Sequence, residues 1–432
     1  MFRKWIKQNQ ISPDIRLITQ WEGETGDLFY TRGALVQVKN GKGLLYENYS
    51  EEPGKAAYDT LMFGDTPLFQ LQGDEYFCPT CEKIVRSGYQ LEQTEEFHEE
   101  RMNGENVPFS EALRGIKPLL GLLKDNCYVI LDTQLYPVDG NGHIFWNVPA
   151  SEEVVPGSCL FYRGNNEWGC NRPYFTVATQ SIRKLRESRV EYYREHPSCR
   201  AVAYYMDGYM TALLDGHHKA MAAALDHRRV NALVIMRCYP VSQYHGKGSN
   251  PTEYLQAGEM RFSCEQYGVK AAAGIMAWEK EPLEKMQRLR GLFSEQEPPF
   301  PYDHDALACV YPNAREISAV DVYVDKYGEI TEEWLDRILI EEHICNPEEI
   351  RTLMEALAGL RHERLFELAD YFLGKCSYQN LLSFHDTDTF GTIVEQLMKL
   401  PHTGELVDYM VNLMVEYEDE YPSVGERIKE WL

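Results

Sequence analysis

The chain has 432 residues, and the hydrophobic share of 44% is enough for packed cores. Its 67 acidic and 43 basic residues give a net charge of −24, which disfavours nucleic acid as a partner and requires a local basic pocket for any phosphate ligand. We find no apolar run of membrane-spanning length, no secretion signal, and eleven scattered cysteines that are most simply reduced thiols. We therefore expect a cytoplasmic protein of two or three domains without a membrane partner.

Residues 1–124 alternate short apolar runs with turns, which predicts a small β-rich module. The pair Asn40-Gly41 lies between the apolar runs 34–38 and 43–46 and predicts a hairpin that joins them. The apolar spacing over 109–123 predicts a helix near the end of the module.

Cys78 and Cys81 frame a Cys-Pro-Thr-Cys knuckle, and its tight turn brings two thiolates close enough to share one zinc ion. A zinc ribbon uses two such knuckles, whereas this chain has one. Ligand-type residues without a diagnostic spacing that could complete the site are His98, Cys127, Cys159 and Cys170. The knuckle predicts structural Zn²⁺; a redox-active pair and a reduced pair without a ligand stay open as alternatives.

Residues 125–300 predict an α+β domain. Its expected elements are a buried strand at 127–131, a turn at 139–142, a helix at 176–194, strands at 201–206 and 232–236, and helices at 253–267 and 283–293. The glycine loop at 246–250 lacks the full spacing of a P-loop.

The run Asp215-Gly216-His217-His218-Lys219 predicts a strand that ends at Asp215 and a helix that begins at once. A helix N-terminus presents unpaired N–H groups and the positive end of a dipole to an anion, and glycine lets the backbone approach a ligand. The two histidines and the lysine add hydrogen-bond donors and positive charge. The turn therefore predicts a phosphate site; an ordinary capped turn is the alternative.

This strand, turn, alanine-rich helix and strand resemble the second box of the ParB/sulfiredoxin-like superfamily, in which a DGHHR form is found. The stretch from Arg172 through the 201–206 strand is similar to the first box of ParB, so the likeness covers about 170–240. Members of the superfamily use this turn to hold nucleotide phosphates, as in CTP-binding ParB, ATP-dependent sulfiredoxin and free-serine kinases. The turn here lacks sulfiredoxin's cysteine, and the chain has no ParB-type DNA-binding helices.

The resemblance implies a nucleotide-binding protein that takes ATP or CTP with Mg²⁺. Phosphate would be bound by Gly216, His217, His218 and Lys219, together with Arg172. In a phosphotransferase or nucleotide hydrolase, Asp215 and His217 would be the catalytic residues, with Asp215 placing Mg²⁺ or a substrate hydroxyl. Serine kinases of this fold use a glutamate base, for which the candidates are Glu187, Glu191 and Glu195.

Residues 301–432 predict an all-helical domain, in which HEAT-like hairpins would suit the short loops. The expected helices are 332–343, 347–359, 362–372, 389–399, 404–416 and 423–431. From residue 318 onward the chain has 25 acidic and 9 basic residues, which is either a solvated surface or a docking face for a basic protein partner. The sequence His385-Asp386 has metal-ligand residue types but is also an ordinary helix start.

The sequence therefore predicts a multidomain α+β protein with a nucleotide site in its central domain. The alternative is a non-catalytic, nucleotide- or zinc-dependent switch or adaptor that recruits a protein through the acidic helical domain. A third reading is a degenerate domain that binds nothing at the turn.

Overall fold

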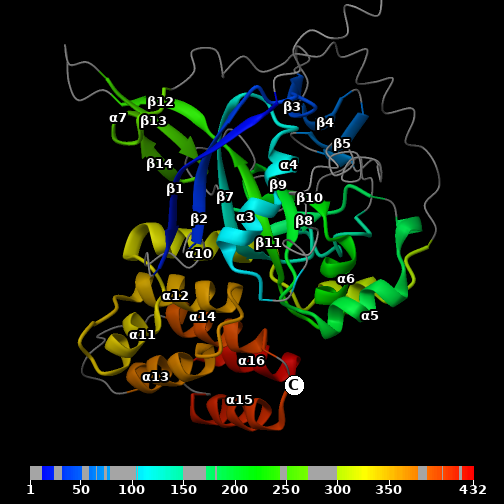
Figure 1. Cartoon of the computed structure of the whole chain (residues 1–432). Helices are drawn as coiled ribbons and strands as arrows, with labels where there is room; N and C mark the ends of the chain where they lie inside the picture. Colours follow the sequence, from blue (N-terminus) through cyan, green and yellow to red (C-terminus); the bar gives the residue numbers. More distant parts are fainter. Residues whose placement is uncertain are drawn as a thin grey trace, which may run out of the picture. The chain divides into compact units, whose positions relative to one another are not determined.

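The computed structural model describes residues 12–23, 32–50, 58–64, 66–72, 75–77, 104, 106–148, 172–180, 182–243, 251–270, 299–377, 387–400, 402–417 and 421–432. It is a mixed α+β structure with two compact units, Met1–Tyr311 and Pro312–Leu432 (Figure 1). The expected boundary between residues 124 and 125 lies inside the first unit, and the division into three domains stays a prediction.

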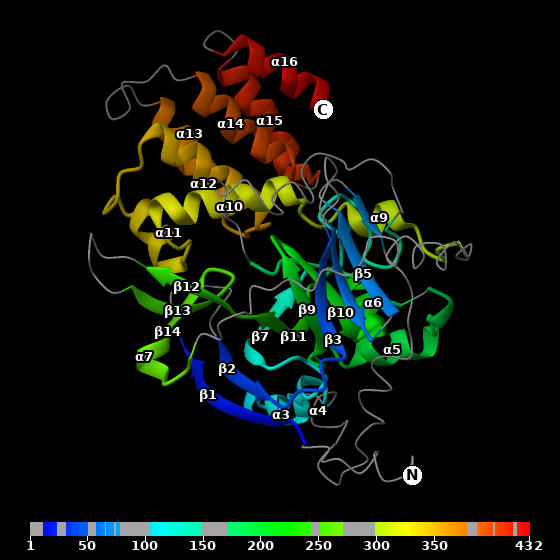
Figure 2. The same ribbon diagram turned by 90° about the horizontal axis from the view of Figure 1, so that it is seen from above.

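The first unit is built on a seven-stranded mixed sheet (Figure 2). Its strands, in spatial order, are β1 (Asp14–Glu22), β2 (Arg32–Lys39), β7 (Asn126–Leu135), β11 (Val230–Arg237), β9 (Ala201–Asp207), β10 (Met210–Asp215) and β8 (Phe175–Val177). The pairs β11–β9 and β10–β8 are parallel and the others antiparallel. Nearly continuous apolar sequences form the buried centre at β7 and β11, as the sequence predicts.

Two smaller sheets and several helices complete this unit. One sheet contains β3 (Leu45–Ser50), β4 (Tyr58–Phe63), β5 (Thr66–Gln72) and β6 (Glu75–Phe77), and the other β12 (Tyr239–Gln243), β13 (Thr252–Ala257) and β14 (Met260–Ser263). The helices are α3 (Phe109–Gly115), α4 (Lys117–Leu120), η2 (Ile182–Lys184), α5 (Glu187–Glu195), α6 (His217–Leu225), α7 (Cys264–Tyr267) and α9 (His304–Ala308). Helix α6 packs against α5 and lies on β9 and β11.

The expected hairpin at Asn40-Gly41 is wrong. The strand before it, β2, pairs with β1 and β7, whereas β3 after it pairs with β4 in another sheet. The Gly41 amide donates to Asp125, and a Cβ added at Gly41 would lie 2.1 Å from the carbonyl oxygen of Leu123. The glycine is therefore needed for a close backbone approach, not for a two-residue hairpin turn.

The expected helices at 176–194 and 253–267 are largely wrong. The first stretch begins as β8, whose Thr176 and Val177 suit a strand, and becomes helical only at η2 and α5. The second stretch is the β13–β14 hairpin followed by the short α7; Gly258 has φ +56° at the hairpin turn. Pairing with neighbouring strands determined the secondary structure of both segments, and the apolar periodicity of a sequence does not indicate such pairing.

The second unit is helical. Its helices are α10 (Ala314–Tyr327), α11 (Glu332–Leu339), α12 (Pro347–Gly359), α13 (Leu365–Ser377), α14 (Thr387–Met398), α15 (Gly404–Glu416) and α16 (Pro422–Trp431). All but α10 were expected, and the bounds of α12 and α15 agree with the sequence prediction. Cap signals explain that agreement: Asn346 and Thr403 each accept a hydrogen bond from the first turn of their helix.

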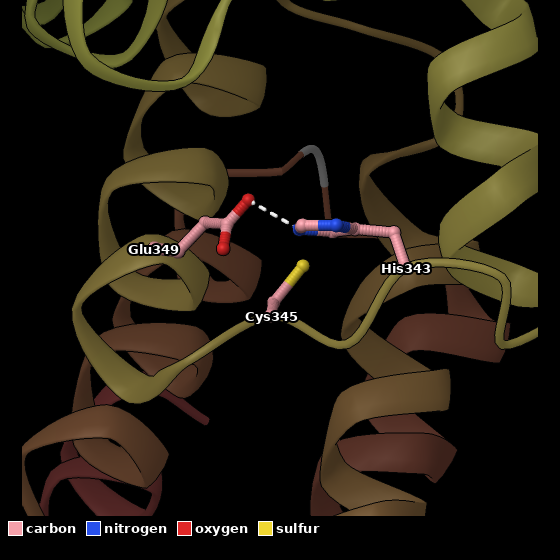
Figure 3. Close-up of side chains that lie close together, drawn as sticks. All are labelled: His343, Cys345 and Glu349. Carbon is pink, nitrogen blue, oxygen red and sulfur yellow. Dashed lines mark hydrogen bonds and ion pairs between the residues drawn. The ribbon is translucent and has the colours of Figure 1, made fainter.

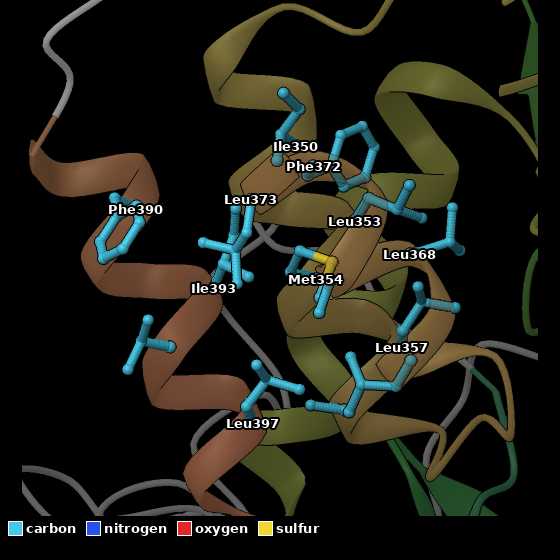
Figure 4. Close-up of a cluster of buried hydrophobic side chains, with 14 of the residues drawn as sticks. Ile350, Leu353, Met354, Leu357, Leu368, Phe372, Leu373, Phe390, Ile393 and Leu397 are labelled. Atoms are coloured by element: carbon cyan, nitrogen blue, oxygen red, sulfur yellow. The ribbon is translucent and has the colours of Figure 1, made fainter. Parts of the chain in front are cut away.

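The core of the second unit lies between α12, α13 and α14 (Figure 4). Helix α12 supplies Ile350, Leu353, Met354 and Leu357 at three- and four-residue spacing, and each is buried. Burying each such side chain contributes about 1.5–3 kcal/mol before conformational entropy is counted, so this stripe is the principal reason that α12 docks. No helix in the described part of the chain is both long and apolar enough to span a bilayer.

Candidate functional site

The predicted strand, turn and helix are confirmed at the end of β10. The strand ends at Asp215, Gly216 has φ +98° and ψ 22°, and α6 begins at His217. A Cβ added at Gly216 would lie 2.6 Å from the Cβ of Ala201 on β9. Ala201 therefore occupies the space that a side chain at position 216 would need, and only glycine fits there.

The two histidines bind the backbone of the segment before α5. His217 Nε2 accepts a hydrogen bond from the Thr179 amide at 3.1 Å. His218 Nε2 lies 3.1 Å from the Arg186 amide and 3.2 Å from the Lys184 carbonyl oxygen. With the amide as donor, Nε2 is unprotonated and the ring proton of the neutral histidine is on Nδ1. Both rings therefore tie the start of α6 to residues 179–186.

Neither histidine is charged at neutral pH, so the expectation that both add positive charge is wrong. Burial lowers the pKa of His217 to about 3. Burial, followed by the positive charge of Arg189 and to a smaller degree that of Arg186, lowers the pKa of His218 to about 4. The Trp146 ring covers both imidazoles, with centroid distances of 5.5 and 5.7 Å.

Lys219 is buried and has protein partners. Its Nζ donates to the Arg200 carbonyl oxygen at 2.7 Å and to Asp215 Oδ2 at 3.3 Å, and it lies 5.4 Å from the Tyr193 ring centroid. Burial raises the pKa of Asp215, but the charge and hydrogen bond of Lys219, together with the neighbouring His217 and the Gly216 amide, more than offset this, so the pKa lies below its ordinary value. The Asp215 side chain remains 30% exposed, so this carboxylate can still meet solvent or an ion.

Arg172 lies away from this turn. Strands β8 and β10 are parallel, with Phe175 beside Met210. Arg172 precedes β8 and Asp215 ends β10, so the two occupy opposite ends of the pair. Asp215 lies five residues beyond the level of Phe175 and Met210, about 17 Å at 3.3 Å per residue, and Arg172 lies three residues before that level. The buried Arg172 guanidinium donates to Glu259 at 2.6 Å. The structure therefore does not bring Arg172 to the predicted phosphate site.

A basic segment that the sequence analysis did not single out lies beside His218. It carries one acidic residue, Glu187, and four cations: Arg183, Lys184, Arg186 and Arg189. Arg186 and Arg189 are exposed, and the Arg186 amide donates to His218 Nε2 at 3.1 Å, which places the segment beside the start of α6. Neither guanidinium makes an ion pair with the part of the chain that the structure describes. The excess of basic over acidic residues in this segment was the sequence signal that could have indicated an anion site.

The other predicted residues divide into two groups. Those outside the described residues are Cys78, Cys81, His98, Cys159, Cys170, the 246–250 loop, the expected helix at 283–293 and His385-Asp386. Cys127 is described and is buried in β7. Glu187, Glu191 and Glu195 are exposed on α5, and Glu191 pairs with Arg194. These glutamates therefore form a solvated face of α5.

The sequence analysis missed a cluster in the second unit. His343, Cys345 and Glu349 each direct one ligand atom to a common point, and these atoms lie within 4.8 Å of one another. The His-x-Cys-x₃-Glu spacing is no known metal signature, which is why the sequence did not reveal it.

No protein-family model, curated protein or solved structure matches this chain.

Proposed function

We propose that the protein binds the phosphates of a nucleotide, ATP or CTP, at the start of α6, and that it acts as a nucleotide-dependent switch. The observation that carries this proposal is the hydrogen bond from the Arg186 amide to His218 Nε2 at 3.1 Å, which places a segment with two exposed arginines, Arg186 and Arg189, beside the first turn of α6. A helix N-terminus and two cations together favour a multiply charged anion. The resemblance of the turn to the ParB/sulfiredoxin-like second box supports a nucleotide as that anion.

The charge distribution supports a local site. The chain carries a net charge of −24, so a phosphate ligand needs a local group of cations such as this one. Guanidinium groups bind phosphate oxygens in a two-pronged geometry that lysine does not offer. Lys219, the predicted phosphate ligand, is instead held by Arg200 and Asp215. We therefore assign phosphate contact to Arg186 and Arg189 and a positioning role to Lys219.

The hydrogen bonds of the turn favour binding over catalysis. A general base needs an accessible lone pair, and His217 uses Nε2 to accept from the buried Thr179 amide. Its low pKa also means that the ring is not a protonated imidazolium, and so not a general acid, at neutral pH. A phosphotransferase or hydrolase remains the second candidate, favoured by one observation: the partly exposed Asp215 carboxylate at a helix start, where Mg²⁺ could bridge to phosphate.

The acidic second unit would supply the output of the switch. Several of its cations are already paired with acids, as in Lys326–Glu348 and Arg364 with Glu332, Asp336 and Glu367. The excess of acid from residue 318 onward is thus left to face solvent or a basic protein partner.

Isothermal titration of the full chain with ATP, CTP and GTP, with and without Mg²⁺, tests the proposal. The double variant Arg186→Ala/Arg189→Ala should weaken binding about tenfold or more, since charge-assisted hydrogen bonds contribute about 1.5–3 kcal/mol each. The charge-matched control is Arg16→Ala/Arg114→Ala, which removes two exposed arginines elsewhere in the first unit and should bind like the wild type.

The outcomes separate the candidates. Binding without turnover, lost in the double variant, supports the switch. Nucleotide hydrolysis that disappears in Asp215→Asn would support the enzyme instead. Saturation that is equal in both double variants, or no binding by any nucleotide, would contradict a phosphate site at α6.

A further inference from the structure

We propose that His343, Cys345 and Glu349 form a Zn²⁺ site in the second unit. The three side chains come from the loop after α11 and from the first turn of α12, and they point toward one another (Figure 3). The ligand atoms lie within 4.8 Å of one another, and His343 Nε2 is 2.8 Å from Glu349 Oε1. The site is separate from the nucleotide site proposed at α6.

The loop holds the imidazole in place. The His343 amide donates to the Arg337 carbonyl oxygen at 3.1 Å, which folds the loop back on the end of α11. The His343 ring lies against the Trp334 ring, with centroids 4.4 Å apart. Trp334 is itself fixed, because its Nε1 donates to the Tyr323 hydroxyl at 2.8 Å. A ligand fixed in this way binds a metal with little loss of side-chain entropy.

The start of α12 turns a carboxylate into the cluster. Helices α10 and α12 both begin with a capping asparagine and have glutamate at the third position. In α10 the Glu316 carboxylate returns to the cap and accepts from the Asn313 amide. In α12 Asn346 caps the Glu349 amide, but the Glu349 carboxylate pairs with His343. Glu349 is therefore available as a ligand where its counterpart completes a capping box.

Burial and charge both suit zinc. Cys345 and Glu349 are 5% and 3% exposed, whereas the His343 side chain is 29% exposed and gives an ion access. One thiolate and one carboxylate neutralise a divalent cation, which leaves no net charge in the buried site. Sulfur and nitrogen ligands select zinc over Mg²⁺ or Ca²⁺.

Zinc binds sulfur at about 2.3 Å and nitrogen or oxygen at about 2.0–2.2 Å, with tetrahedral angles. Binding therefore lengthens the His343–Glu349 separation by about half an ångström and places the Cys345 sulfur about 3.6 Å from each of the other two ligand atoms, which are all within 4.8 Å of one another before binding. A fourth position is left for water. On binding, the Cys345 thiol proton leaves to solvent and the imidazole proton moves from Nε2 to Nδ1, so that sulfur and Nε2 each donate a lone pair.

Cobalt titration of the full chain tests this site, because Co²⁺ replaces Zn²⁺ and a bound thiolate gives it a charge-transfer absorption. All proteins carry Cys78→Ser/Cys81→Ser, which removes the knuckle as a competing site. The parent and the matched control Cys309→Ser, which changes an exposed cysteine of the first unit, should show the absorption. Cys345→Ser should abolish it.

A second variant guards against a folding defect at the buried cysteine. His343→Ala changes a half-exposed loop residue, and it should weaken Co²⁺ binding by at least about tenfold, the scale of losing even an outer-shell partner. Zn²⁺ should raise the Tm of the parent and not that of His343→Ala. A folded parent without the absorption, or an absorption unchanged by both Cys345→Ser and His343→Ala, overturns the proposal.

Discussion

The starts of α6 and α12 both place polar side chains beside a neighbouring loop, but these side chains take different partners. At α6, His217 and His218 turn to the backbone amides of Thr179 and Arg186. At α12, Glu349 turns away from its own cap and meets His343. The histidines of α6 thus hold neighbouring segments together, whereas Glu349 of α12 and two side chains of the loop before it lie close together. Residues that look like a ligand site in the sequence can therefore have a structural role, while residues without a recognisable spacing form a possible ligand set.

Acid should reveal the structural role of the α6 histidines. The folded pKa of His217 is about 3, below its ordinary value of 6.5. Between these values the unfolded state binds a proton that the native state does not, so stability is full above pH 6.5 and falls as the pH is lowered toward 3. At about 1.4 kcal/mol per pKa unit, His217 alone should remove about 3 kcal/mol by roughly pH 4.5.

Urea unfolding at several pH values, followed by circular dichroism, checks this expectation. His217→Gln retains an acceptor for Thr179 and should flatten the acid limb. His143→Gln is the control of opposite sign: the hydrogen bond to Asp139 raises the pKa of His143, so its contribution is lost as the pH rises. An acid limb that is identical in wild type and His217→Gln would show that His217 is not buried neutral.

Gly216→Ala should destabilise the first unit by about 3 kcal/mol. The backbone at φ +98° disfavours an L side chain, and the added Cβ would clash with Ala201. The matched control is Gly268→Ala, which also has positive φ but meets nothing within 4 Å and should cost only about 1 kcal/mol. Equal losses in urea unfolding would mean that β9 does not press on the turn.

Loss of either asparagine cap should cost about 1 kcal/mol. Asn346→Ala and Asn313→Ala each remove one side-chain bond to a first-turn amide. If zinc binds Glu349, Zn²⁺ should raise the free energy of unfolding of Asn313→Ala as much as that of the parent, because the metal stabilises the native state of the whole unit. Asn346→Ala should gain less, because it loosens the turn that holds Glu349. Unfolding is measured with and without Zn²⁺ in the background that lacks Cys78 and Cys81. No gain from Zn²⁺ in the parent or in either variant would argue against metal at Glu349.

Local signals were sufficient wherever an element is specified by its own residues. The cap and the three- and four-residue apolar spacing predict α12, and the Asp215-Gly216 break predicts the change from β10 to α6. The local signals failed where a segment distant in the sequence determines the conformation. Asn40-Gly41 has a hairpin sequence but serves a close approach to Leu123, and Thr176 belongs to a strand because β10 lies beside it.

The sequence by itself determined the helical second unit, its acidic charge, and the strand, turn and helix around Gly216, since these follow from local propensity and composition. Only the tertiary structure decided which polar side chains are paired within the protein and which ones meet to form a possible binding site. Lys219 is neutralised by Asp215, Arg172 lies at the far end of β8, and His343 reaches Glu349 across a loop. The physical reason is that burial and pairing depend on neighbours that are distant along the chain, and a short motif does not encode them.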